Sequence, residues 1–195
     1  MNRVILSAST DETILAVTRQ HKLVDLEIEQ QINTEIVGCI YKGVVKNIVP
    51  AVDGIFVDIG IGKNAFLRRK DLLNEKRFPT EGSPILAQVI KSDTDMKGAL
   101  ITEKISMFGK YAVTLSGTGY IGVSKKIRSE SVRERLKETG KEICAEHMGL
   151  IIRTAAENAD MDEFRKDITR LKENWDIIQK RFRMEKSPTL LYRES

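Results

Sequence analysis

Cysteine, histidine and tryptophan are scarce in this sequence, and their scarcity excludes several classes of protein. The 195 residues include 2 cysteines, 2 histidines and 1 tryptophan. Cys39 and Cys144 lie far apart, and neither has a partner at the spacing of a zinc or redox motif. We therefore expect both thiols to be free and reduced. A structural zinc would need four ligands from isolated positions, so we expect no metal or other cofactor within this chain.

Long apolar runs and targeting signals are also lacking. No stretch approaches the roughly 20 apolar residues that a membrane helix needs. The N-terminus becomes polar at Ser7, directly after Val4-Ile5-Leu6, which is unlike a secretory signal or a transit peptide. We therefore expect a cytoplasmic protein that makes no contact with a membrane.

The chain has the composition of a folded domain with a modest basic surplus. Hydrophobic residues make up 41%, charged residues 31%, and the formal net charge is +4. Acidic side chains outnumber basic ones in residues 1–36, and the surplus is reversed in residues 37–195. A basic surface permits nucleic-acid binding, but ordinary solubility explains it equally well.

Residues 1–36 contain three short β-rich runs separated by polar turns, which predict strands. A piece of this size cannot bury a core of its own. It therefore needs something to pack against.

Residues 37–105 contain short β-branched runs separated by glycine and proline, at the spacing of a small antiparallel barrel. Turn-forming residues fall at Pro50, at Gly60-Ile61-Gly62 and at Pro84. We therefore predict a five-stranded barrel. Its strands are expected at 40–49, 54–59, 64–67, 85–91 and 98–104.

Residues 106–195 predict two strands and two helices. The strands are expected at 111–115 and 148–154. The first helix is expected to begin near Ser131, with a capping box from Ser131 to Glu134, and to be interrupted by Gly140.

The second helix has a start signal at Asp160 and a stop at Ser187-Pro188. Its apolar stripe favours packing on the chain's own sheet, although a coiled coil with a second chain is an alternative. The stripe consists of Met161, Phe164, Ile168, Leu171, Trp175, Ile178 and Phe182.

Two patterns that could indicate a binding site are too weak to carry one. Gly60-Ile61-Gly62-Lys63 lacks the spacer and the following helix of a phosphate loop. Asp93 and Asp95 could hold a cation, but such a pair is more typical of a solvated turn. No catalytic constellation stands out.

Phe56 and Phe66 lie on neighbouring predicted strands of the barrel, with Lys42, Lys46, Lys63 and Lys97 available around them. Small barrels bind single-stranded nucleic acid by stacking bases on aromatic rings and holding phosphates with amines. The alternative is that both phenylalanines belong to the core.

Several blocks of the sequence resemble the ribonuclease E/G family, in the family's order. They are Ile40-Tyr41-Lys42-Gly43-Val44-Val45, Phe56-Val57-Asp58-Ile59-Gly60, Asn64-Ala65-Phe66-Leu67, Gly149-Leu150-Ile151-Ile152-Arg153-Thr154-Ala155-Ala156 and Leu190-Leu191-Tyr192-Arg193-Glu194-Ser195. Within that family the residues of these blocks are more similar to the ribonuclease G branch than to the ribonuclease E branch.

The resemblance implies an α+β architecture in three parts. Residues 1–36 would be the N-terminal β-hairpin piece of an RNase H-like subdomain. Residues 37–105 would be an inserted five-stranded OB-fold β-barrel, the ribosomal-protein type of RNA-binding domain. Residues 106–195 would be an α/β sensor region for the RNA 5′ end, with a long C-terminal helix.

The resemblance also implies two sets of RNA-binding residues. Phe56, Phe66 and Lys97 match the positions that contact single-stranded RNA. Gly109 and Val113, through the main chain, and Arg153 and Thr154, through their side chains, match a pocket for a 5′-monophosphate. A guanidinium offers phosphate a planar fork of donors, and a hydroxyl adds another.

The expected function is substrate recognition, as the N-terminal half of an endoribonuclease of RNA processing and decay. The family's catalytic magnesium ligands, and the cysteines that join subunits through zinc, match no position before Ser195. We therefore expect this chain to bind single-stranded RNA with a 5′-monophosphate but not to cut it.

Other interpretations remain open. Exposed strand edges in residues 1–36 could join copies of the chain into a homo-oligomer. The chain could also be a self-sufficient RNA-binding protein, or an assembly module that pairs through the 161–182 helix.

Overall fold

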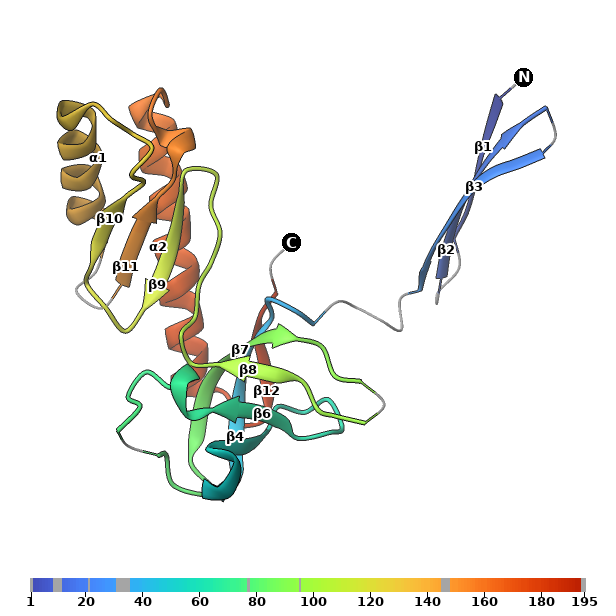
Figure 1. The fold of residues 1–195 in the computed structure, drawn as a ribbon, viewed down its shortest axis with the longest axis horizontal. Helices are drawn as coiled ribbons and strands as arrows, with labels where there is room; N and C mark the ends of the chain where they lie inside the picture. Colours follow the sequence, from blue (N-terminus) through green and yellow to red (C-terminus); the bar gives the residue numbers. More distant parts are fainter. Residues whose placement is uncertain are drawn as a thin grey trace. The chain divides into compact units, whose positions relative to one another are not determined.

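A computed structural model divides the chain into two compact units, Met1–Ile36 and Val37–Ser195 (Figure 1). The structure describes residues 2–8, 12–20, 22–30, 36–76, 78–94, 96–144 and 148–193. None of the helices within these ranges is long and apolar enough to cross a membrane.

The first unit is a three-stranded antiparallel sheet. Its strands run in the order β1 (Asn2–Ala8), β2 (Glu12–Arg19) and β3 (Lys22–Gln30), with β2 in the centre. Val4, Ile5 and Leu6 are each more than half exposed. Because successive side chains of a strand point to opposite faces, β1 leaves apolar side chains uncovered on both sides of the sheet. The predicted strands are confirmed, and so is the lack of a core around this strand.

The second unit begins with a closed five-stranded barrel. Its sheet order is β4-β5-β6-β8-β7, and β7 pairs with β4 to close it. Strand β8 is parallel to β6, whereas the other pairs are antiparallel. The predicted OB-fold is therefore confirmed. The strands are β4 (Ile40–Val49), β5 (Gly54–Asp58), β6 (Ala65–Arg68), β7 (Pro84–Lys91) and β8 (Leu100–Thr102), with short 3-10 turns at Pro50–Val52 and Arg69–Asp71.

A second small sheet follows the barrel in sequence. Its order is β10-β11-β9, in which the central β11 is parallel to β10 and antiparallel to β9. The two helices α1 and α2 pack beside this sheet (Figure 1). The elements are β9 (Ala112–Ser116), β10 (Ile121–Val123), α1 (Glu130–Ile143), β11 (Met148–Ile152), a 3-10 turn at Thr154–Ala156, and α2 (Met161–Met184).

Helix α1 differs from its prediction at Ser131 and at Gly140. It begins at Glu130, and the residue before it, Ser129, makes no side-chain cap. The predicted capping box at Ser131 is therefore wrong, because its hydroxyl lies 3.1 Å from that of Ser129. Gly140 does not interrupt the helix either. It is buried where an added Cβ would lie 3.3 Å from methyl carbons of Ile121 and Leu150, so it brings α1 close to the sheet.

Helix α2 matches its predicted start. The Asp160 side chain accepts hydrogen bonds from the backbone N–H groups of Asp162 (2.8 Å) and Glu163 (3.2 Å), which satisfies two donors of the first turn.

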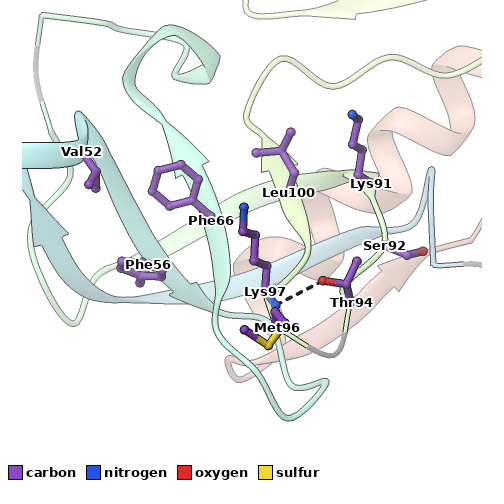
Figure 2. Close-up of a pocket in the computed structure, with 10 residues that line it drawn as sticks. Val52, Phe56, Phe66, Lys91, Ser92, Thr94, Met96, Lys97 and Leu100 are labelled. Carbon is purple, nitrogen blue, oxygen red and sulfur yellow. Dashed lines mark hydrogen bonds between the residues drawn. The ribbon is translucent and has the colours of Figure 1, made fainter.

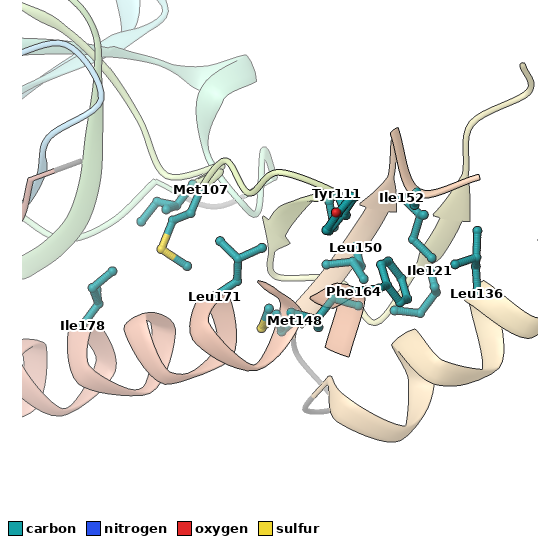
Figure 3. Close-up of a cluster of buried hydrophobic side chains, with 14 of the residues drawn as sticks. Met107, Tyr111, Ile121, Leu136, Met148, Leu150, Ile152, Phe164, Leu171 and Ile178 are labelled. Carbon is teal, nitrogen blue, oxygen red and sulfur yellow. The ribbon is translucent and has the colours of Figure 1, made fainter. Parts of the chain in front are cut away.

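The apolar stripe of α2 lies inside the chain's own core. Phe164, Ile168, Leu171 and Ile178 are buried there. Figure 3 shows Phe164 among core residues of the sheet, with Leu171 and Ile178 farther along α2. Met161, Trp175 and Phe182 pack against the same cluster. The coiled-coil alternative is wrong, because the stripe is already covered.

The barrel and α2 are joined by contacts that the sequence did not predict. Strand β12 (Thr189–Tyr192) returns to pair with the first half of β4. Lys42 on β4 donates from Nζ to the carbonyl oxygens of Phe182 and Glu185, at 2.6 Å each. Lys42 therefore caps the C-terminal end of α2, which corrects the expectation that it serves the phenylalanine pair.

Candidate nucleic-acid interface

Phe56 and Phe66 form an aromatic pair on the outside of the barrel. They lie directly opposite each other on β5 and β6, with ring centroids 5.4 Å apart and planes tilted by 48°. Both are half-buried, whereas Ile55 and Leu67 beside them are fully buried. Because side chains alternate along a strand, the phenylalanines face outward. The alternative that both belong to the core is wrong.

The aromatic pair lies in a surface pocket of about 770 Å³ (Figure 2). Phe56, Phe66 and Leu100 supply apolar surface from three strands, and lysines lie among the other lining residues. The chemistry suits a ligand with flat apolar faces and negative charge. The lining residues are Val52, Phe56, Phe66, Lys91, Ser92, Thr94, Met96, Lys97, Gly98 and Leu100.

Two glycines make this pocket sterically possible. A Cβ on Gly54 would lie 2.3 Å from two atoms of the Phe66 ring, so the ring rests directly on the Gly54 backbone. A Cβ on Gly98 would lie 1.9 Å from the carbonyl oxygen of Asn64, so only glycine allows β8 to begin this close to β6.

The lysines around the pocket separate into different roles. Lys97 lines the pocket, is exposed, and makes no ion pair within the described ranges. Lys46 lies 3.4 Å from the Asp58 carboxylate, and Lys63 donates to the Thr94 carbonyl at 2.8 Å. Neither lines the pocket. Lys91 also lines the pocket, although the sequence analysis did not identify it. It stands at the end of β7, where the loop to β8 begins.

The loop between β7 and β8 holds Lys97 at the pocket. The Lys97 N–H lies 3.2 Å from Thr94 Oγ1, and the Thr94 N–H donates to the Lys97 carbonyl at 2.8 Å. Met96 in the same loop is 91% exposed and also lines the pocket. No sequence signal singled out Met96. Of the acidic pair in this loop, Asp95 lies outside the described residues.

The four residues matched to the 5′-phosphate pocket come from two neighbouring segments. Arg153 directly follows β11, and its Nη1 donates to the carbonyl of Gly109 at 2.9 Å. The Arg153 N–H donates to the Tyr111 carbonyl at 2.8 Å. Val113 pairs with Ile151 on β11 and bridges to the segment beside Gly109. The structure thus brings Gly109, Val113 and Arg153 together.

Thr154, the next residue in the chain, contacts a different segment through its side chain, and the sequence analysis did not identify this partner. Its Oγ1 lies 3.0 Å from Oγ of Ser124, in the turn after β10. Arg133 on α1 holds that turn by donating from Nη1 to the carbonyls of Ser124 (2.8 Å) and Ile127 (3.1 Å). Arg153 and Thr154 are both exposed. In the part of the chain that the structure describes, the Arg153 guanidinium has no carboxylate partner.

A carboxylate of α2 supports the loop that contains Gly109. Glu163 Oε2 accepts hydrogen bonds from the Tyr111 hydroxyl (2.6 Å) and from Lys110 Nζ (3.1 Å). These two bonds, the Tyr111 one first, lower the pKa of Glu163. Contact of Lys110 with Tyr111, and then with Glu163, raises the pKa of Lys110.

The described residues do not fit a metal ion. No three of their His, Cys, Asp or Glu side chains are grouped so as to hold one. Within the same ranges both cysteines are free of disulfides, and burial raises the pKa of Cys144 to about 11.

Comparison with known proteins gives one match over the barrel and another over the residues that follow it. The profile of the S1 RNA binding domain matches residues 34–102, and that of the Ribonuclease E/G family matches residues 106–195. Ribonuclease G of Escherichia coli (strain K12) is 34% identical over 98% of this chain and 42% of its own length. This chain belongs to the ribonuclease E/G family.

Two further proteins are similar to this chain along most or all of its length. Ribonuclease G of Haemophilus influenzae is 34% identical over 91% of this chain and 40% of the relative. Ribonuclease E of Buchnera aphidicola subsp. Schizaphis graminum is 30% identical over 100% of this chain and 22% of the relative. The chain therefore spans less than half the length of these relatives.

Proposed function

We propose that this chain recognises single-stranded RNA through two surfaces. One is the Phe56–Phe66 pocket, and the other, called the Arg153 site, consists of Gly109, Val113, Arg153 and Thr154. In this proposal the Arg153 site senses a 5′-monophosphate. In this proposal the chain is the substrate-recognition part of an endoribonuclease. Residues 1–36 contribute a piece of an RNase H-like subdomain. Because the described residues offer no metal site, the proposal contains no metal-dependent step.

The aromatic pocket supports binding of a single strand rather than a duplex. Stacked bases in a duplex offer no free faces, whereas an unpaired base can stack on Phe56 or Phe66. Lys97 has no ion pair within the described ranges, so its ammonium is available to a phosphate. Stacking on an aromatic ring contributes about 1–3 kcal/mol per base.

The Arg153 site supports recognition of a terminal phosphate. One guanidinium nitrogen is fixed on the Gly109 carbonyl, which orients the planar group while other N–H donors remain. Thr154 is the next residue in the chain, and its hydroxyl, which lies 3.0 Å from that of Ser124, is a further possible donor. The observation that carries the proposal is this oriented, exposed guanidinium without a carboxylate partner in the described part of the chain. A terminal phosphate carries more charge than an internal one, which favours it there.

The test compares otherwise identical RNA oligonucleotides that carry a 5′-phosphate or a 5′-hydroxyl, with binding measured by fluorescence anisotropy. We expect the unmodified chain to prefer the 5′-phosphate by about tenfold or more, because hydrogen bonds to charged groups contribute roughly 1.5–3 kcal/mol. Arg153→Ala should remove the preference. Arg183→Ala, an exposed arginine near the other end of α2, should keep it. Equal affinities of the unmodified chain for the two RNAs would refute the proposal.

A further inference from the structure

Asp167 is a nearly buried carboxylate on α2 that faces the loop preceding β9. Its side chain is 8% exposed. Oδ2 accepts a hydrogen bond from the Tyr111 N–H at 2.8 Å, and Oδ1 accepts one from Arg170 Nη2 at 3.0 Å. Both carboxylate oxygens therefore have a partner, one on the loop and one on α2.

The loop rests directly on this carboxylate. An added Cβ on Gly109 would lie 2.4 Å from Asp167 Oδ2 and 2.9 Å from both Cγ and Oδ1. No real side chain fits at that separation, so Gly109 is required by the closeness of Asp167. The carboxylate thus sets how far the segment from Gly109 to Tyr111 stands from α2.

The same segment fixes Arg153 from its other side. The carbonyl of Gly109 accepts from Arg153 Nη1, and the carbonyl of Tyr111 accepts from the Arg153 N–H. A continuous series of contacts therefore runs from the Asp167 carboxylate, through Tyr111 and Gly109, to the guanidinium. Movement of the loop away from α2 would move the acceptor that orients Arg153.

We propose that Asp167 is a positioning residue for the 5′-phosphate site. It seats the Gly109–Tyr111 segment so that the Gly109 carbonyl holds the Arg153 guanidinium. This inference rests on the proposed function of that site.

Asp167 carries a negative charge near a proposed anion site, so its charge and its hydrogen bonds would affect phosphate binding in opposite directions. An uncompensated buried carboxylate would repel a phosphate, and removing it would then strengthen binding. Here Arg170 pairs with it at 3.0 Å, and the Tyr111 N–H takes the other oxygen. The hydrogen-bonding geometry of Asp167, rather than its charge, is therefore what the site uses, and the two effects predict opposite results for its removal.

The test uses the same pair of RNAs with Asp167→Ala and Asp167→Asn. We expect Asp167→Ala to reduce affinity for the 5′-phosphate RNA about 10- to 100-fold, toward that of the 5′-hydroxyl RNA, because small misplacement of a positioning group has effects of this size. Affinity for the 5′-hydroxyl RNA should change less than about twofold, since stacking in the barrel is untouched. Asp167→Asn should restore part of the preference, because its amide oxygen can still accept from Tyr111.

Two further variants secure the interpretation. Gly109→Ala perturbs the same contact from the loop side and should lose the preference in the same way. It also decides the question if Asp167→Ala does not fold. Asp176→Ala removes an exposed carboxylate of α2 that pairs with Lys172, and should leave the preference unchanged.

The outcomes separate this inference from the function on which it rests. Absence of a 5′-phosphate preference in the unmodified chain would remove the proposed function. A preference that is lost in Arg153→Ala but retained in Asp167→Ala or in Gly109→Ala would overturn the role of Asp167 alone. Equal weakening for both RNAs would also overturn it, because it would indicate a general structural effect.

Discussion

Single residues with the same chemistry have different roles in this protein, and their surroundings decide which. Four lysines precede or follow the aromatic residues in sequence, yet only Lys97 of those four lines the pocket. Lys42 caps a helix, and Lys46 and Lys63 are engaged by Asp58 and Thr94. The two phenylalanines face outward only because their neighbours in the strands fill the barrel interior.

At this scale we predict that Phe66→Ala weakens RNA binding without unfolding the barrel. The ring is half-buried on the outer face, so its removal should reduce affinity for a single-stranded oligonucleotide by roughly 1–3 kcal/mol and affect stability less. Phe78→Ala is the matched control. Phe78 is a half-buried ring elsewhere on the domain, stacked 3.7 Å from the Arg69 guanidinium. Equal affinity losses in the two variants would contradict the assigned role of Phe66.

Helix α2 is the element on which the candidate site depends. Its first turn is capped by Asp160, Glu163 and Asp167 in its N-terminal part contact the segment from Lys110 to Tyr111, and its last turn is held by Lys42 of the barrel. One helix therefore connects the second sheet to the OB-fold, and burial of its apolar stripe fixes its orientation.

We predict opposite phenotypes for two lysine substitutions. Lys42→Ala should lower the free energy of unfolding by about 1–3 kcal/mol, because two hydrogen bonds from a charged group are lost, and should leave RNA affinity unchanged. Lys97→Ala should leave stability unchanged, weaken RNA binding, and reduce the slope of log affinity against log salt by about 0.7. Chemical denaturation and a salt titration measure the two quantities. Weaker RNA binding by a stable Lys42→Ala variant would show that Lys42 contacts RNA after all.

The whole molecule consists of two units that differ in how completely they bury apolar surface. The cluster that joins the second sheet, α2 and β12 lies within residues 37–195. The first unit exposes Val4, Ile5 and Leu6, and its outer strands β1 and β3 are edges of the three-stranded sheet. Exposed apolar edges favour pairing with further polypeptide.

Accordingly, we predict that residues 37–195 fold alone and retain both RNA-binding surfaces. Their thermal unfolding should remain cooperative, and their affinity for 5′-phosphate RNA should match that of the full chain within about twofold. Any concentration-dependent association of the full chain, measured by analytical ultracentrifugation, should disappear with residues 1–36. A shortened chain that does not unfold cooperatively would contradict the independence of this unit.

Some elements could be predicted from local pattern and others could not. The barrel strands and α2 were predicted because turn residues, an N-cap and an apolar period act over a few neighbouring residues. Strands β10 and β12 were missed, since segments of 3 and 4 residues contain too little pattern. The positions of Ser124 and Asp167 beside the candidate site also escaped prediction, because contacts between distant segments leave no local signal.

The sequence by itself determined the class of fold, the family and the chemical types of the candidate site residues, because alternation, turn chemistry and motif blocks are local properties of the chain. Only the tertiary structure decided which lysine lines the pocket, that both phenylalanines face outward, and that a buried carboxylate of α2 seats the loop beside Arg153. The physical reason is that hydrogen-bond partners and burial depend on which distant segments meet. That is settled when the barrel closes and α2 packs against it.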